Sequence, residues 1–200
     1  MISKLLTGTF FKAVLVINAV MVLLPVFFLF NTSLRDSNSF SVNPIELASD
    51  PEWSNFTLVW ADGEFPIFLK NSLIITLGSL AVILICALGA GFILGRYQFK
   101  GNSFIYGFVL TGMLVPAKLA ILPLFIQLKW MNLIDSHLGL ILVYASGALP
   151  AAIFIMAGFF RSLPADIDSA ARIDGASEFQ LLRLVLAPLV RPGLAIVAIY

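Results

Sequence analysis

The chain alternates between long apolar runs and short polar segments. Uncharged or nearly uncharged runs occupy residues 13–30, 71–95, 104–128 and 138–160, and a fifth run starts at residue 184 and continues to residue 200. A bilayer core about 30 Å thick needs roughly 20 predominantly apolar residues to be crossed by a helix. The pattern therefore predicts four complete membrane-spanning helices and a fifth, incomplete one.

The third run differs from the others because it contains a charge and two prolines. Lys118 lies close to Pro116, and Pro123 follows it within the same run. A proline inside a helix removes a backbone hydrogen bond and clashes with the preceding turn. We therefore expect the outer end of this span to be broken or to lie in the membrane interface.

The composition indicates the class of protein. Hydrophobic residues make up 60% of the chain and charged residues only 12%, and the mean hydropathy is +1.01. An ordinary soluble domain has about 45–50% apolar and about 25% charged residues. The chain is therefore predicted to be all-α, a polytopic transmembrane helical bundle that forms a single domain over residues 1–200. Its formal net charge of +1 and its lack of a basic patch argue against a nucleic-acid partner.

The distribution of Lys and Arg predicts how the spans are oriented, because cytoplasmic loops retain these residues. With the N-terminus inside, the inner segments hold the larger group, which is Lys4, Lys12, Arg96, Lys100, Arg161, Arg172 and Arg183. The outer segments hold Arg35, Lys70, Lys118 and Lys129. The N-terminus is therefore predicted to be cytoplasmic, with the loop 31–66 outside and the segment 161–183 inside. We expect the outer loop to form an interfacial cap, with contact to a partner as the alternative.

Small and polar residues inside the spans have different implications. Ala87, Gly91 and Gly95 repeat every four positions, which lets a neighbouring helix approach closely. None of the complete spans has an Asp or Glu near its middle, and such residues usually mark proton or ion pathways. The polar candidates for a solute path are Thr111, Tyr144 and Ser146. A neighbouring helix is the alternative partner for each of them.

A small charged segment separates the fourth and fifth runs. Pro164 is favourable in the first turn of a helix, and Asp166 and Asp168 are favoured near the positive end of that helix. Gly175 is expected to end the helix in a left-handed conformation. Residues 177–180, Ser-Glu-Phe-Gln, then have the pattern of a capping box that opens a second helix.

The second helix is expected to run into the fifth span, where Pro188 and Pro192 kink it or confine it to a short section. The small side chains of Ala170, Ala171 and Ala176 would let the backbone of another protein approach this segment closely. They indicate either a docking surface that transmits movement or a cap that only seals the inner face. The local chemistry leaves both interpretations open.

The sequence SAARIDGASEFQLLRLVLAPLVRP, residues 169–192, resembles the EAA loop of the permease subunits of ATP-binding-cassette importers. The matching positions are Ala170, Ala171, Asp174, Gly175, Ala176 and Pro188. The surrounding chain is similar to the carbohydrate-importing, maltose-type branch, notably at residues 70–73, 95–97 and 160–164. This resemblance covers residues 10–200.

One position departs from the family pattern. Ser169 stands where the family has a glutamate, an acid that helps to hold the docking helix to the ATPase, and Asp168 precedes it. Either Asp168 replaces this acid with a shifted reach, or the contact is weaker in this chain.

The resemblance implies the type I importer permease fold with six spans, of which this chain would contain four and part of the fifth. It also implies that residues 161–183 form a cytoplasmic coupling loop. Asp168 and Ser169 join the six matching positions as its expected contact residues. The expected partners are ATP-binding-cassette ATPase subunits, a second permease subunit in a heterodimer, an extracytoplasmic solute-binding protein and the lipid bilayer of a bacterial or archaeal inner membrane.

The function that this resemblance implies is the ATP-driven import of sugars or oligosaccharides. The chain has no G-x-x-x-x-G-K phosphate loop and no evident metal or nucleophile constellation. We therefore expect a non-catalytic subunit that binds no cofactor or metal, with Mg-ATP bound by the partner ATPase. The alternatives are import of another small solute such as glycerol phosphate, a secondary transporter or channel, and a structural membrane scaffold.

Overall fold

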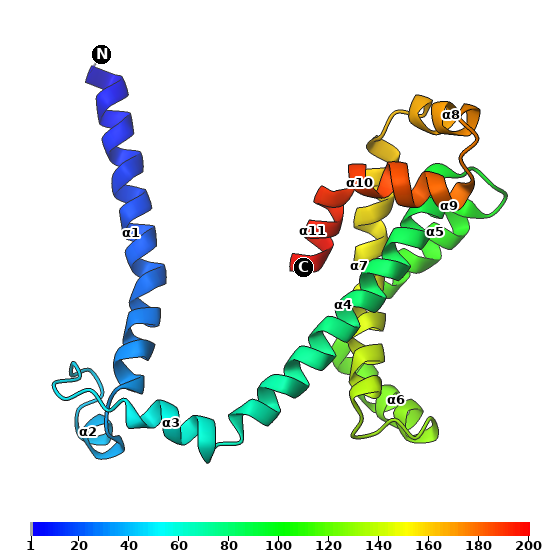
Figure 1. Cartoon of the computed structure of the whole chain (residues 1–200). Coiled ribbons are helices and arrows are strands. Elements are labelled where there is room, and N and C mark those ends of the chain that lie inside the picture. The colour runs from blue at the N-terminus through cyan, green and yellow to red at the C-terminus, as the bar shows by residue number, and fades with distance from the viewer. Residues whose placement is uncertain (1) are drawn as a thin grey trace. The chain divides into compact units, whose positions relative to one another are not determined.

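The computed structural model describes residues 2–200 and, within them, the side chains of residues 11–116 and 119–200. All regular elements in this part of the chain are helices (Figure 1). They are α1 (Ile2–Ser33), α2 (Ser37–Val42), α3 (Ser54–Ala61), α4 (Phe65–Arg96), α5 (Asn102–Thr111), α6 (Ala117–Trp130), α7 (His137–Ser162), α8 (Asp166–Ile173), α9 (Glu178–Gln180), α10 (Ala187–Leu189) and α11 (Arg191–Ile199), with a 3-10 turn at Gly112–Leu114 and a π-helix at Leu181–Leu186. The chain divides into two compact units, with the boundary between residues 68 and 69 inside α4.

Helices of the described chain coincide with all five predicted spans. Three single helices are long and apolar enough to cross a membrane, namely Phe11–Ser33, Phe65–Arg96 and His137–Ser162. Two helix pairs follow the same pattern with a bend inside: Asn102–Leu114 with Leu119–Trp130, bent by 106°, and Glu178–Leu189 with Arg191–Ile199, bent by 72°. The structure therefore has three candidate spans, or five if each bent pair is one span.

The bend in the third stretch lies where the sequence predicts a break. The 3-10 turn after α5 ends at Leu114, and Val115 and Pro116 are extended, with ψ angles of 116° and 118°. A residue that precedes proline is pushed out of the helical region because the proline ring clashes with its backbone. Val115 therefore leaves the helix and α6 starts in a new direction. The side chain of Lys118, which also contributed to the prediction, lies outside the described residues.

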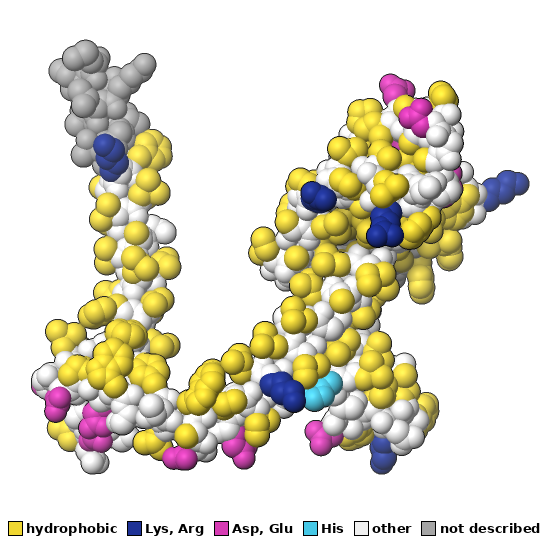
Figure 2. Space-filling view, viewed as in Figure 1, with side chains coloured by type: hydrophobic (Ala, Val, Ile, Leu, Met, Phe, Trp, Pro, Cys, Tyr) yellow, Lys and Arg dark blue, Asp and Glu magenta, His cyan; other side chains and the backbone are white. Residues whose placement is uncertain are grey.

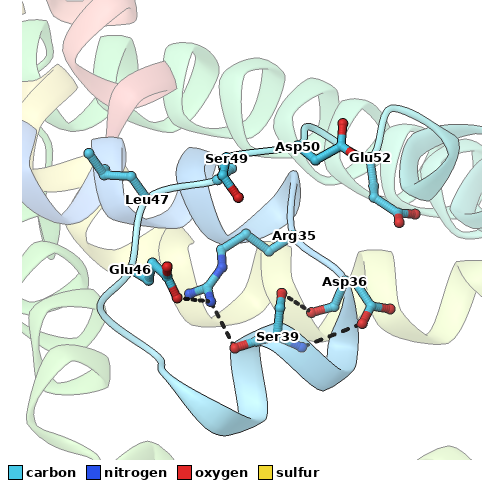
Figure 3. Close-up of a pocket in the computed structure, with 9 residues that line it drawn as sticks. Arg35, Asp36, Ser39, Glu46, Leu47, Ser49, Asp50 and Glu52 are labelled. Carbon is cyan, nitrogen blue, oxygen red and sulfur yellow. Dashed lines mark hydrogen bonds and ion pairs between the residues drawn. The ribbon is translucent and has the colours of Figure 1, made fainter.

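In the first unit, two buried polar side chains at the end of α1 organise the loop that follows. Asn31 donates from Nδ2 to the carbonyl of Glu46 at 3.0 Å. Arg35 donates to the carbonyls of Asn43 and Ser39 at 2.7 and 2.8 Å, and Figure 3 shows its guanidinium pointing towards Ser39 and Glu46. Buried donors that lose their acceptors are costly, so these contacts fix the path of the loop.

The same unit exposes aromatic side chains on and beside α3. Trp53 lies against Phe56 with ring centroids 6.1 Å apart, and Trp60 lies against Phe65 at 5.7 Å. All four side chains are exposed. Tryptophan is enriched at the headgroup level of membranes, which agrees with the interfacial cap expected for residues 31–66. That location stays a prediction.

The second unit is built on a close crossing of α4 and α7. A Cβ atom added at Gly91 would lie 2.6 Å from the Cβ of Met156, and one added at Gly95 would lie 2.9 Å from the carbonyl oxygen of Ala157. Ala87, Met156 and Ala157 are fully buried. The predicted close approach at the small residues of α4 is therefore confirmed, and α7 is the helix that makes it.

The core of this unit continues from the crossing towards α8 and the helices after it. Its buried members are Ala87, Phe92, Leu94, Ala152, Ile153, Met156, Phe160, Ala171, Leu181, Leu186, Val190 and Val197. Figure 2 shows hydrophobic side chains along the middle of this unit and charged side chains towards its two ends. Figure 1 places α8 at the end of the unit where α4 and α7 terminate. The charged segment of the sequence is thus seated on the packed ends of the two helices.

Candidate functional site

The first helix of the charged segment is α8, and it ends as the sequence predicts. Gly175 has a φ angle of +82°. Its N–H donates to the carbonyl of Arg172 at 3.1 Å, and the N–H of Ala176 donates to the carbonyl of Ala171 at 3.0 Å. This pair of bonds is the Schellman arrangement, in which a left-handed glycine satisfies the last carbonyls of a helix.

Replacing Gly175 tests this conformation. A Cβ atom added there would meet nothing within 4 Å, so a substitution causes no steric clash. The cost of Gly175→Ala is therefore conformational. A left-handed L-residue costs about 1–2 kcal/mol, and the reduced freedom of the unfolded chain offsets part of this cost. We expect a loss of about 1 kcal/mol in the free energy of unfolding, measured by denaturation in detergent micelles. Gly175→Asn should lose less, since asparagine tolerates this region better; equal losses would contradict the explanation.

The second helix opens with the predicted capping box and then widens. The N–H of Gln180 donates to Ser177 Oγ at 3.4 Å, and Gln180 Oε1 accepts from the N–H of Ser177 at 2.8 Å. After α9 the chain forms a π-helix whose Leu181 and Leu186 side chains are fully buried. Such wide turns are rare and occur frequently at functional sites. No local sequence pattern predicts this π-helix.

Arg96, the last residue of α4, holds the start of α8. Its Nε donates to Asp168 Oδ2 at 3.0 Å and its Nη2 donates to Asp168 Oδ1 at 2.5 Å. The guanidinium also donates to the carbonyls of Phe160, Leu163 and Pro164, at 3.1, 2.7 and 3.0 Å. The two side chains are only 7% and 12% exposed. A bidentate arginine–carboxylate pair fixes geometry as well as charge, so this contact sets the position of α8.

Arg161 makes the reciprocal contact from the end of α7. Its Nη2 donates to the carbonyl of Leu94 at 3.1 Å, and its guanidinium lies over the ring of Tyr106 in α5, 4.3 Å from the ring centroid. The last turn of a helix has carbonyls without partners inside the helix. α4 and α7 therefore each supply an arginine to the other helix's final carbonyls.

Tyr97, Arg172 and Glu178 form a second polar group on this surface. The hydroxyl of Tyr97 donates to Glu178 Oε2, and Arg172 Nε donates to Glu178 Oε1 at 3.1 Å. Burial raises the pKa of the Tyr97 hydroxyl, and its hydrogen bond to the carboxylate raises this pKa further, while Arg172 partly opposes both effects. Tyr97 is therefore a protonated donor at neutral pH. Arg172 and Glu178 are exposed, so their ion pair contributes little to stability.

The structure separates the expected contact residues of the segment into two faces. The exposed ones are Ser169, Ala170, Asp174, Gly175 and Pro188, while Ala176 is half-buried. Ala171 is only 8% exposed and belongs to the hydrophobic core of this chain. The expectation that Ala171 offers its side to another protein is therefore wrong. Its small size instead lets α8 settle onto the ends of its own helices.

Asp168 also faces inwards, because both carboxylate oxygens accept hydrogen bonds from Arg96. The Asp168 carboxylate is therefore occupied inside this chain, and the roles of Asp168 and Ser169 towards an ATPase stay a prediction. Ile173 is outside the motif positions, and its side chain is 86% exposed on the outer face of α8. An isoleucine between the charged residues Arg172 and Asp174 was the available signal.

The polar candidates inside the spans are not brought together by any hydrogen bond found in the described chain. Thr111 Oγ1 donates to the carbonyl of Phe108 at 2.6 Å, and Ser146 Oγ donates to the carbonyl of Val143 at 2.9 Å. Tyr144 is 57% exposed. Hydroxyls bonded to their own helix backbone are satisfied without a partner helix, so a role in a solute path stays a prediction. Among the described residues no group of three His, Cys, Asp or Glu side chains could hold a metal ion.

Residues 87–200 match the model of the family described as "Binding-protein-dependent transport system inner membrane component". The chain is 34% identical over 188 residues to the diacetylchitobiose uptake system permease protein NgcG of Streptomyces coelicolor, covering 94% of this chain and 62% of that protein. It is 32% identical to the trehalose transport system permease protein SugB of Mycobacterium tuberculosis, covering 88% and 64%. The chain thus spans less than two thirds of the length of these relatives.

A solved structure gives the same fold. The chain superposes on a chain of a bacterial ABC transporter involved in the import of the acidic polysaccharide alginate with a TM-score of 0.83. The match covers 98% of this chain and 69% of the other, at 24% sequence identity. The all-helical, membrane-spanning architecture predicted from the sequence is therefore that of an ABC importer permease.

Proposed function

The chain belongs to the family of binding-protein-dependent transport system inner membrane components, and from this premise we propose that it is a permease subunit of an ATP-driven importer of sugars or oligosaccharides. The similarity to permeases named for diacetylchitobiose and trehalose supports a carbohydrate as the solute. The proposed complex contains a second permease, ATPase subunits that bind Mg-ATP, and an extracytoplasmic solute-binding protein. In it this chain is non-catalytic and its N-terminus is cytoplasmic.

The observation that carries this proposal is the two-faced α8. Its inner face, with Asp168 and Ala171, is buried against the chain's own helices. Its outer face presents Ser169, Ala170 and Ile173, which follow the three- and four-residue spacing of one side of a helix. A short helix held firmly at its base, with an exposed apolar side chain, suits docking into a cleft of another protein. We propose that residues 161–183 dock on the ATPase in this way.

The two other solute-transport alternatives have less support. A secondary transporter driven by protons or ions is disfavoured by the lack of acidic residues in the complete spans and by family membership. Import of an anion such as glycerol phosphate would favour a basic residue in the solute path. The polar candidates for this path, Thr111, Tyr144 and Ser146, are all uncharged hydroxyl side chains.

A cysteine crosslink tests the docking role. Cys86 is the single cysteine and is exposed, so we would replace it by serine before placing a new cysteine at Ile173. The variant is coexpressed with the candidate ATPase carrying cysteines in its cleft. We expect a crosslink whose yield changes when ATP binds. The matched control is Ala171→Cys, two residues away on the buried face, which should not crosslink.

The proposal is rejected if the ATPase copurifies with the variants but Ile173→Cys gives no crosslink, or if both positions react equally. Uptake of radiolabelled sugars by cells that contain the complete importer then identifies the solute class. Competition by unlabelled glycerol phosphate, and not by oligosaccharides, would support the alternative.

A further inference from the structure

We propose that Arg96 is a positioning residue that locks α8 to the ends of α4 and α7, so that these helices and α8 move as one body when an ATPase pulls on α8. This inference rests on the proposed function. It adds a role for a residue outside the docking segment itself, because Arg96 lies in α4 and binds α8 through Asp168.

The geometry of Arg96 uses the whole guanidinium. An arginine side chain has five N–H donors in a rigid fork, and five hydrogen bonds from Arg96 are present. Two of these bonds reach the carboxylate of Asp168 in the first turn of α8. The other three reach the carbonyls at the end of α7 and in the turn before α8. One buried side chain therefore joins α4, α7 and α8.

Arg161 makes this joint rigid from the other side. It binds the carbonyl of Leu94 and lies over the ring of Tyr106, while the side chain of Phe160 packs against Phe92 with ring centroids 5.7 Å apart. The ends of α4 and α7 cannot separate without breaking several buried contacts. A force applied to α8 is thus transmitted to two long helices.

The far end of α8 is held in a different way. It ends at Gly175, and the only ion pair that α8 makes there, within the described chain, joins the exposed side chains of Arg172 and Glu178. Exposed pairs are weakened by solvent and salt. The two ends of α8 therefore differ, with a buried joint at Asp168 and an exposed, adjustable contact at Arg172. Because only the contact between Arg96 and Asp168 is buried, movement of α8 is transmitted to α4 and α7 through Arg96.

The test compares Arg96→Lys with Arg191→Lys in the complete importer, reconstituted in liposomes with its binding protein and ATPase. Lysine keeps the charge but has a single nitrogen, which cannot reach the carboxylate and the three carbonyls in the same geometry. We expect Arg96→Lys to lower the amount of solute imported per ATP hydrolysed by about fivefold or more, the lower end of the usual range for coupling between sites. Arg191→Lys, at an exposed arginine outside the docking segment 161–183, should leave this ratio unchanged.

Asp168→Asn is the second variant, because it removes the carboxylate charge and leaves the carbonyl contacts of Arg96 in place. It should lower the same ratio, with copurification of the ATPase retained. The inference is overturned if both variants import solute at the wild-type ratio. It is also overturned if both lose the ATPase entirely, since Arg96 would then serve only assembly. Failure of the wild-type chain to copurify with any ATPase would instead reject the proposed function.

Discussion

Replacing Gly91 by leucine is expected to force α4 and α7 apart and to lower the free energy of unfolding by more than the roughly 1–3 kcal/mol that overpacking usually costs. The first added atom alone would lie 2.6 Å from the Cβ of Met156 and 3.1 Å from the backbone nitrogen of Ala157. Neither neighbour is the free end of a flexible side chain. The strain can therefore be relieved only by moving a helix.

The matched control for this prediction is Gly89→Leu. Gly89 lies two residues earlier on α4, and a Cβ atom added there would meet nothing within 4 Å. Both variants are purified in detergent and their free energies of unfolding are measured by titration with sodium dodecyl sulfate. The control should be as stable as the wild type. Equal destabilisation at both positions would show that leucine disturbs α4 itself and not the crossing.

Truncation of Phe160 to alanine should be the second severe change. The side chain of Phe160 is fully buried and packs against Phe92. Removing a large buried ring leaves a cavity that its surroundings fill only in part, and such changes typically cost about 3–5 kcal/mol. The carbonyl of Phe160 still accepts from Arg96, so the loss reports on packing and not on the hydrogen bond.

Phe154→Ala on the same helix provides the comparison, because the Phe154 side chain is 49% exposed. Its loss should be much smaller in the same unfolding titration. A small effect of Phe160→Ala, comparable to that of Phe154→Ala, would mean that the ends of α4 and α7 are not the packed base on which α8 rests.

Features set by neighbouring residues in the sequence could be predicted. Gly175 ends α8 and Ser177 caps the next helix because these conformations depend on a glycine or a hydroxyl at one position. The apolar runs likewise placed the helices, since their length and lack of charge depend on the chain alone. The break at Pro116 belongs to the same class, because proline acts directly on the residue before it.

Features set by distant contacts could not be predicted. The direction of Asp168 and Ala171 depends on Arg96 and on the crossing of α4 and α7, which local spacing does not reveal. The local sequence therefore left docking and sealing open for the whole segment, whereas the structure packs one face of α8, with Asp168 and Ala171, inside the chain. The π-helix at Leu181–Leu186 has no local pattern either, since Leu-Leu-Arg-Leu-Val-Leu suits an ordinary helix equally well.

The span of sequence between Arg96 and its acceptors also affects how the protein is made. Its partners lie 64 to 72 residues further along the chain. At a synthesis rate of roughly 5–20 residues per second, Arg96 waits about 3–14 s before they leave the ribosome. During that interval the carboxylate and the carbonyls that later accept from Arg96 do not exist, so its guanidinium has none of these five partners. The joint between α4, α7 and α8 can therefore close only after α7 and the first turn of α8 have been made.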